Sequence, residues 1–161
     1  MRKVAPLTSA GWSHRFNTHG FMTYNGKVSY TQWFRHGGVE GYSSAYRGVL
    51  PKPLGGPTPL LYIKKLSDEV QTFARMGVQR MQSVLGLDPP FAVCIASYGF
   101  AGSVIYFGPE YGDPHPIESD VELLPPIIVE GPSAPNLDNE MRFLLDVIWQ
   151  SAGYDGAPRS K

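Results

Sequence analysis

Residues 67–86 read SDEVQTFARMGVQRMQSVLG, and their apolar side chains recur at steps of three and four. This spacing is typical of an amphipathic α-helix with one buried side. Ser67 is suited to cap the first turn, and Asp68 and Glu69 match the positive end of the helix dipole. Gly86 is suited to end the helix, and the prolines that follow it forbid a continuation. The rest of the chain therefore has to cover the apolar side of this helix.

Before the helix, three stretches predict a β-meander. Residues 21–24, 27–35 and 39–46 are rich in aromatic and β-branched residues, and Asn25-Gly26 is the strongest hairpin dipeptide in the chain. We expect a three-stranded antiparallel sheet whose aromatic residues pair across the strands. These aromatic residues are Tyr24, Tyr30, Trp33, Phe34, Tyr42 and Tyr46.

After the helix, residues 91–97 form an apolar run that predicts a strand covered on both faces. The single cysteine, Cys94, lies inside this run, so we expect a buried and inert thiol. Residues 98–102 predict a turn, and residues 103–107 predict a returning strand that completes a hairpin. Residues 123–130 predict the last strand.

The end of the chain predicts a second amphipathic helix. Pro135 suits its first turn, Ser133 is close enough to cap it, and Gly153 stops it. Its buried face is expected to consist of Leu137, Met141, Leu144, Leu145, Ile148 and Ala152.

Strand clusters separated by single helices predict the α+β fold class. We expect two layers, in which a mostly antiparallel sheet, built from the meander and the hairpin, is covered by the two amphipathic helices. Residues 48–59, rich in proline and glycine, predict a crossing loop. A chain of 161 residues suits one domain. We assign residues 1–13 to a loose N-terminal segment, 14–154 to the single α+β domain and 155–161 to a flexible tail.

The composition limits the classes of partner. The chain carries 14 basic and 14 acidic residues, whereas a free-standing nucleic-acid binder usually has a basic excess. One cysteine allows no internal disulfide, which fits a reducing compartment and predicts a cytoplasmic protein. No stretch approaches the roughly 20 apolar residues that span a bilayer, so we expect no membrane partner.

Four separated motifs occur in the order and spacing of one protein family. They are Arg15-x-Asn17-x-x-Gly20-Phe21, then Gln32-Trp33-Phe34-Arg35-x-Gly37-x-Val39-Glu40, then Leu85-Gly86-Leu87-Asp88-Pro89-Pro90-Phe91 leading into Gly99-x-x-Gly102, and finally Asp146-Val147-Ile148-Trp149-Gln150-x-Ala152-Gly153. Over about residues 15–155 the chain resembles the C-terminal region of bacterial ATP-binding or helix-turn-helix proteins. Those proteins begin with a Schlafen-related AlbA-type domain associated with DNA binding.

The resemblance implies a limited role for this region. In that family the nucleic-acid or nucleotide label belongs to the N-terminal domain, and the sequence shows no counterpart of it. The matching region carries no established chemistry, so the resemblance implies an accessory or interaction module.

Polar residues within these motifs are the candidate contact residues. One hypothesis gives Arg15 and Arg35 a contact with an anion, a phosphate or nucleic acid, with Asn17, Glu40 and Trp149 as further ligand contacts. The alternative is structural: Asn17 shapes a turn, and Arg35 pairs with Glu40 across a hairpin. Trp149 equally suits a packing anchor beside the buried face of the second helix.

No residue pattern predicts a catalytic set, a metal site or a cofactor. His14, His19, His36 and His115 lack the paired ligands at short spacing that zinc requires. The acidic segment 110–122 lacks the spacing of an EF-hand. A nucleophile elbow and a zinc-protease motif are also absent from the sequence.

Three hypotheses of function follow from these observations. The leading one is a non-catalytic module that binds another protein or its own copy. An exposed aromatic patch would support it, and complete burial of Trp33, Tyr42 and Tyr46 would count against it. The second is a nucleic-acid-binding module, which requires the basic side chains to converge with the meander aromatics. The third is an enzyme or binder for a small phosphorylated ligand, with Arg15 or Arg35 inside a deep pocket.

The basic side chains that the second hypothesis needs lie in several parts of the chain. They are Arg15, Arg35, Arg47, Lys52, Lys64, Lys65, Arg75 and Arg80.

Overall fold

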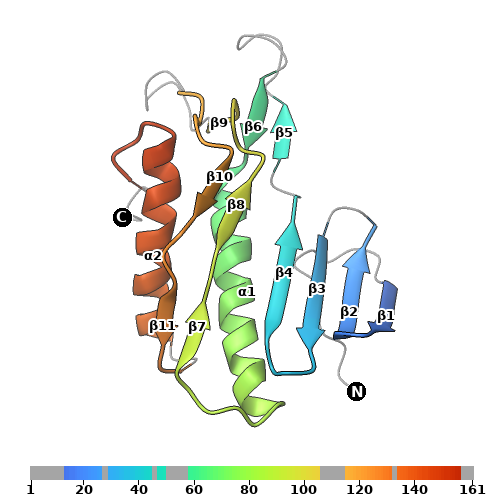
Figure 1. Cartoon of the computed structure of the whole chain (residues 1–161). Helices are drawn as coiled ribbons and strands as arrows, with labels where there is room; N and C mark the ends of the chain where they lie inside the picture. Colours follow the sequence, from blue (N-terminus) through green and yellow to red (C-terminus); the bar gives the residue numbers. More distant parts are fainter. Residues whose placement is uncertain are drawn as a thin grey trace.

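Figure 1 shows the computed structural model of the chain, coloured from the N-terminus to the C-terminus. The structure describes residues 13–26, 29–44, 47–49, 58–105, 115–131 and 134–156. Within these residues the chain forms two helices and several small sheets, most of them antiparallel. The α+β fold class is therefore confirmed.

The meander is larger than the sequence predicts. It consists of β1 (Ser13–Asn17), β2 (Gly20–Asn25), β3 (Ser29–Phe34) and β4 (Val39–Ser43), paired antiparallel in chain order. The additional strand is β1, which has mostly exposed residues and therefore lacks the alternating burial that reveals a strand in a sequence. Tyr30 is the register partner of both Tyr24 and Tyr42, so aromatic residues pair across the strands as predicted.

The first helix, α1 (Ile63–Ser83), begins about one turn before the predicted start. Tyr62 occupies its cap position without a side-chain hydrogen bond, so the prediction that Ser67 caps the helix is wrong. Asp68 and Glu69 consequently lie beyond the first turn. Ile63 is buried in the core, and this packing outweighs the capping preference of a serine.

α1 ends at Ser83 with Val84 as its cap residue, whereas the sequence predicts that Gly86 caps the helix. Gly86 has a φ of 65°, a left-handed conformation that costs glycine little. The Leu87 N–H then donates a hydrogen bond of 3.1 Å to the Met81 carbonyl oxygen, which satisfies one of the last carbonyls of the helix.

The second helix, α2 (Ala134–Ser151), presents the predicted face to the core. Buried residues on this face and just beyond it are Leu137, Met141, Leu145, Ile148 and Ala152. Trp149 is buried beside them. Gly153 has a φ of 81° and ends the helix as predicted. Ser133 and the side chain of Leu144 lie outside the described residues.

The predicted strand at residues 91–97 is in fact two strands. β7 (Phe91–Val93) pairs with β11 (Ile127–Val129), and β8 (Ala96–Tyr98) pairs with β10 (Val121–Leu123), both antiparallel. Burial alternates along these strands, so the prediction that both faces are covered is wrong. Cys94 lies at the break between β7 and β8 and is exposed, which corrects the prediction of a buried thiol.

The predicted hairpin after β8 does not form. β9 (Val104–Ile105) pairs instead in parallel with β6 (Pro59–Leu61), which pairs with β5 (Arg47–Val49). Gly99 and Gly102 each have a φ of 72°, so the chain turns twice between β8 and β9 and leaves the plane of β8. Parts of the segment predicted as a crossing loop are therefore strands, whereas residues 50–57 lie outside the described residues.

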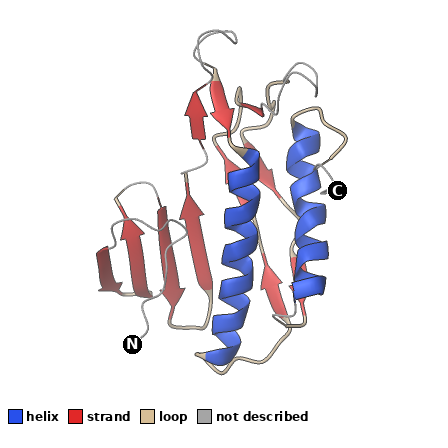
Figure 2. Ribbon diagram, turned by 180° about the vertical axis from the view of Figure 1, so that it is seen from behind, coloured by secondary structure: helices blue, strands red, loops and turns tan. Residues whose placement is uncertain are grey.

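The molecule has two layers. Figure 1 shows β7, β8, β10 and β11 in front of the helices, and Figure 2 shows α1 and α2 in front from the opposite side. The core fills the space between the layers and includes Val78 of α1, Met141 of α2 and Phe91 of β7. The meander lies beside α1, where a Cβ atom at Gly77 would lie 3.3 Å from the Val39 side chain. Neither described helix has the length and apolarity needed to cross a bilayer.

Candidate functional site: a groove between two sheet edges

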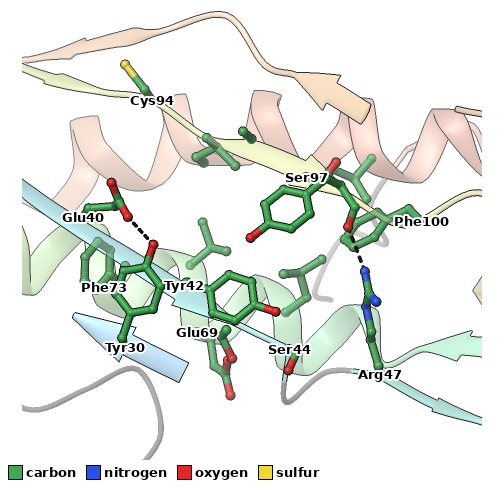
Figure 3. A pocket seen from close by; sticks show the side chains of 18 residues that line it. Tyr30, Glu40, Tyr42, Ser44, Arg47, Glu69, Phe73, Cys94, Ser97 and Phe100 are labelled. Carbon is green, nitrogen blue, oxygen red and sulfur yellow. Dashed lines mark hydrogen bonds between the residues drawn. The ribbon is translucent and has the colours of Figure 1, made fainter. Parts of the chain in front are cut away.

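A groove lies where the meander meets the rest of the molecule. β4 is the last strand of the meander, and β8 is an edge of a separate two-stranded sheet; no ladder joins them within the described residues. The space between them forms a pocket of about 350 Å³ whose inner wall comes from α1 and α2. Figure 3 shows the side chains that line it. We call this pocket the β4–β8 groove.

A row of three tyrosines crosses the groove. The Tyr30 and Tyr42 rings stack with their centroids 5.5 Å apart, and the Tyr42 and Tyr98 rings stack at 6.0 Å. Tyr30 and Tyr42 are register partners on β3 and β4, whereas Tyr98 comes from β8. The row therefore connects the two sheets through aromatic contacts. Neighbouring strands within each sheet are connected by backbone hydrogen bonds instead.

Glu40 holds the first tyrosine of the row. The Tyr30 hydroxyl donates a hydrogen bond to the Glu40 carboxylate, which lines the groove. The pKa of Tyr30 is raised to about 12, chiefly by burial and then by the hydrogen bond and negative charge of Glu40. Burial, and then the neighbouring Tyr42, also raise the pKa of Tyr98. Both phenols therefore stay protonated, and able to donate, at neutral pH.

A second carboxylate enters the groove from α1. Glu69 accepts a hydrogen bond of 2.9 Å from the Ser43 hydroxyl of β4. This hydrogen bond joins a residue of β4 to a residue of α1, and it therefore helps to hold β4 against the helix.

Ser97 of β8 supplies an unusual polar group. Its side chain lines the groove, the residue is 7% exposed, and its Oγ has no hydrogen-bond partner among the described residues. Buried hydroxyl groups are nearly always hydrogen-bonded, so an unpartnered one at the wall of a pocket is a site where a ligand can bind.

Arg47 closes one end of the groove. Its guanidinium donates hydrogen bonds to the carbonyl oxygens of Tyr98 (2.7 Å) and Gly99 (2.9 Å), and it lies over the Phe100 ring at 5.8 Å. An alanine-sized side chain at Gly99 would come within 2.6 Å of this guanidinium. The absence of a side chain at position 99 thus lets Arg47 bind the backbone of the turn.

Of the candidate residues from the sequence, Glu40 lies in the groove, and Arg15, Asn17 and Arg35 lie elsewhere on the meander. The exposed Arg15 lies over the Tyr24 ring at 5.6 Å. Arg35 is exposed as well, and among the described residues it forms no ion pair with Glu40; the predicted pairing is wrong because Glu40 bonds to Tyr30.

Asn17 has the structural role that the sequence allows for it. Its Oδ1 accepts hydrogen bonds from the backbone N–H groups of His19 (3.0 Å) and Gly20 (2.9 Å), which shapes the turn between β1 and β2. Its Nδ2 donates to the Gln32 side chain at 2.8 Å.

Trp149 is the packing anchor of the second helix. It is 3% exposed, belongs to the main core and meets the Tyr154 ring edge-on at 5.3 Å. It does not line the β4–β8 groove.

Sequence reasoning missed most of the groove. The sequence suggests Arg47 only as one of several basic residues, and Glu69 only as a negative charge at the start of the first helix. Ser97 ends a strand predicted to be covered on both faces, and Tyr98 begins a predicted turn. No short-range pattern reveals such residues, because the groove forms between segments that lie far apart in the sequence.

A second surface of interest is the outer face of the strands opposite the helices. Phe91, Ile127 and Val129 point into the core, so the residues that alternate with them point outward. The outward positions of β7, β8, β10 and β11 carry no charged residue. We call them the outer sheet face, and they are Ala92, Ala96, Tyr98, Val121, Leu123 and Ile128.

The described residues contain no group of three side chains suited to hold a metal ion. All four histidines are exposed, as a surface role predicts. The tyrosine hydroxyls, carboxylates and guanidinium of the groove can bind polar groups, and their arrangement does not resemble a nucleophile oriented by a base.

Comparison with known proteins finds no family model, no curated protein and no solved structure that matches this chain.

Proposed function

We propose that this chain is a non-catalytic protein-interaction module that binds a second copy of itself through the outer sheet face. The observation that carries the proposal is the chemistry of this face. When one face of a sheet is exposed to water, the side chains on that face are normally polar. Here, every outward position is uncharged. Val121, Leu123 and Ile128 are each more than half exposed.

An exposed aromatic residue, which the sequence suggests as support for an interaction module, also lies at this surface. Tyr98 is 54% exposed and continues the outer sheet face toward the meander. Trp33 and Tyr42 are half-buried rather than fully buried, and Tyr46 lies outside the described residues. A contiguous apolar surface of this kind marks a protein-interaction site in a folded protein.

A second copy is the partner that the charges favour. The chain has no net charge, so two copies approach without long-range repulsion. An apolar face without charges is also self-complementary, as a two-fold interface requires. A reducing compartment suits the exposed Cys94, so we place the module in the cytoplasm.

The test measures the mass of the protein by sedimentation over a concentration series. We expect a dimer whose dissociation constant rises at least about tenfold in Leu123→Asp, because a buried charge without a partner is costly at an interface. The matched control is Val84→Asp. Val84 lies at the end of α1 with an exposed fraction of 74%, against 76% for Leu123.

Two results would contradict the proposal. One is a monomeric mass at every concentration, and the other is an equal effect of the two substitutions. Circular dichroism spectra of both variants establish that each is folded.

The kinship with the C-terminal region of AlbA- and Schlafen-type proteins remains a proposal that rests on the four sequence motifs. It supports an accessory role, because the region concerned carries no chemistry of its own in that family.

No observation favours the nucleic-acid alternative. The faces of Tyr30, Tyr42 and Tyr98 that would stack on bases stack on one another. The basic residues are also dispersed: Arg75 pairs with Asp138 between the helices, whereas Arg47 binds backbone carbonyls. For a phosphorylated ligand, neither Arg15 nor Arg35 lines the groove.

A further inference from the structure

The β4–β8 groove has an excess of negative charge. Glu40 and Glu69 line it, against one guanidinium from Arg47. Each carboxylate uses one described hydrogen bond, from Tyr30 and from Ser43 respectively. An ionised carboxylate offers about four acceptor sites, so both can accept further donors.

Arg47 does not neutralise this site by pairing with a carboxylate. Its guanidinium is held by the carbonyl oxygens of Tyr98 and Gly99, and neither Glu40 nor Glu69 forms an ion pair with it among the described residues. Within the part of the chain that the structure describes, the carboxylates of the groove therefore have no cationic partner.

The remaining walls of the groove are apolar or aromatic. Leu66, Val70 and Phe73 of α1 form one wall, together with Ile148 of α2, and the tyrosine row crosses the opening. A pocket of about 350 Å³ lies at the small end of the range typical of small-molecule sites.

We propose that the β4–β8 groove binds a small organic cation with a primary ammonium group and an apolar body. The ammonium group lies against Glu69, which Ser43 holds on the α1 side of β4, and the apolar body lies against α1. The buried Ser97 hydroxyl, which has no protein partner, forms a hydrogen bond with the ligand. Glu40, Glu69 and Ser97 are not part of the outer sheet face, although Ala96 and Tyr98 line the groove and also belong to that face.

The first experiment compares three probes of similar size with the full chain. They are 2-phenylethylammonium, 2-phenylethanol and phenylacetate, and their binding is measured by NMR from the amide shifts of residues 96–98. We expect 2-phenylethylammonium to bind at least about tenfold more tightly than the neutral alcohol, because a charge-assisted hydrogen bond is stronger than a neutral one. Phenylacetate is expected not to bind.

The second experiment changes the groove itself. Glu69→Gln keeps an oxygen that accepts from Ser43 but removes the charge, and we expect it to weaken binding of 2-phenylethylammonium about tenfold. Ser97→Ala removes the buried hydroxyl and weakens binding as well. The control is Glu118→Gln, an exposed carboxylate that does not line the groove.

Three results would overturn the proposal. They are tighter binding of phenylacetate, equal binding in Glu69→Gln and Glu118→Gln, and no amide shifts at residues 96–98 with any probe. Glu69→Gln is compared with the unmodified chain by circular dichroism, so loss of binding is not confused with loss of folding.

Discussion

At the scale of single residues, the contact between Tyr30 and Glu40 sets how the protein responds to alkali. Burial and Glu40 together raise the pKa of Tyr30 from its usual 10.0 to about 12. The native state therefore holds this proton more tightly than the unfolded chain does. The resulting stabilisation is fully present below about pH 10 and is lost as the pH rises through about 12.

Glu40→Gln is expected to lower the pKa of Tyr30, because it removes the negative charge that disfavours a phenolate. Burial is the larger cause of the rise, so the pKa should remain above its usual value. Absorbance of the phenolate, followed during an alkaline titration, measures the change. Tyr30→Phe identifies which transition belongs to Tyr30. An unchanged highest-pH transition in Glu40→Gln would show that Glu40 does not act on this phenol.

At the scale of the elements, the end of α1 depends on one backbone conformation. Gly86 has a φ of 65°, and a Cβ atom at this position would meet nothing within 4 Å. Gly86→Ala therefore changes only the conformational energy, and we expect a loss of about 1 kcal/mol in the free energy of unfolding. Urea unfolding measures it.

The control for this prediction is Gly131→Ala. Gly131 also has open space around its Cα but lacks the left-handed conformation. Its substitution should leave the stability unchanged or raise it slightly, because alanine restricts the unfolded chain. Equal losses in the two variants would show that the left-handed conformation is not the cause.

The elements also differ in how well the sequence predicts them. Both helices follow from their apolar spacing, because Leu66, Val78, Met141 and Ile148 repeat at the helical period and each is buried. The strands are less predictable. β1 has no alternating burial, and the partner of β9 is set by long-range packing against β6, which no local pattern records.

The candidate groove was predicted least well, for the same reason. Of the candidate residues that the sequence suggests, Glu40 lines it, whereas Arg15, Arg35 and Trp149 lie elsewhere. Ser97 becomes notable only when its burial and its lack of a partner are known, and neither property is visible in the sequence.

At the scale of the whole molecule, the tyrosine row connects the meander to the sheet that contains β8. No ladder joins β4 to β8 within the described residues, so the Tyr42–Tyr98 stack carries part of that connection. A double-mutant cycle with Tyr42→Ala and Tyr98→Ala should give a coupling free energy of about 1 kcal/mol, as stacked aromatic pairs do. Urea unfolding of the four proteins in the cycle provides the measurement.

A second cycle supplies the comparison. It combines Tyr42→Ala with Phe143→Ala in place of Tyr98→Ala. Phe143 is exposed on α2, in the layer opposite the outer sheet face. The effects of Tyr42→Ala and Phe143→Ala should add, because distant sites are independent. A coupling free energy between Tyr42 and Tyr98 that is no larger than that between Tyr42 and Phe143 would show that the tyrosine row does not stabilise the contact between the sheets.

The break between β7 and β8 exposes a residue that can be labelled chemically. Cys94 is the single cysteine of the chain, it is exposed, and it lines the groove. A thiol-reactive fluorophore therefore attaches at one known place without any prior mutagenesis. Its emission reports directly on the polarity of the groove and on whether a ligand occupies it, so the protein carries its own attachment point for a spectroscopic sensor.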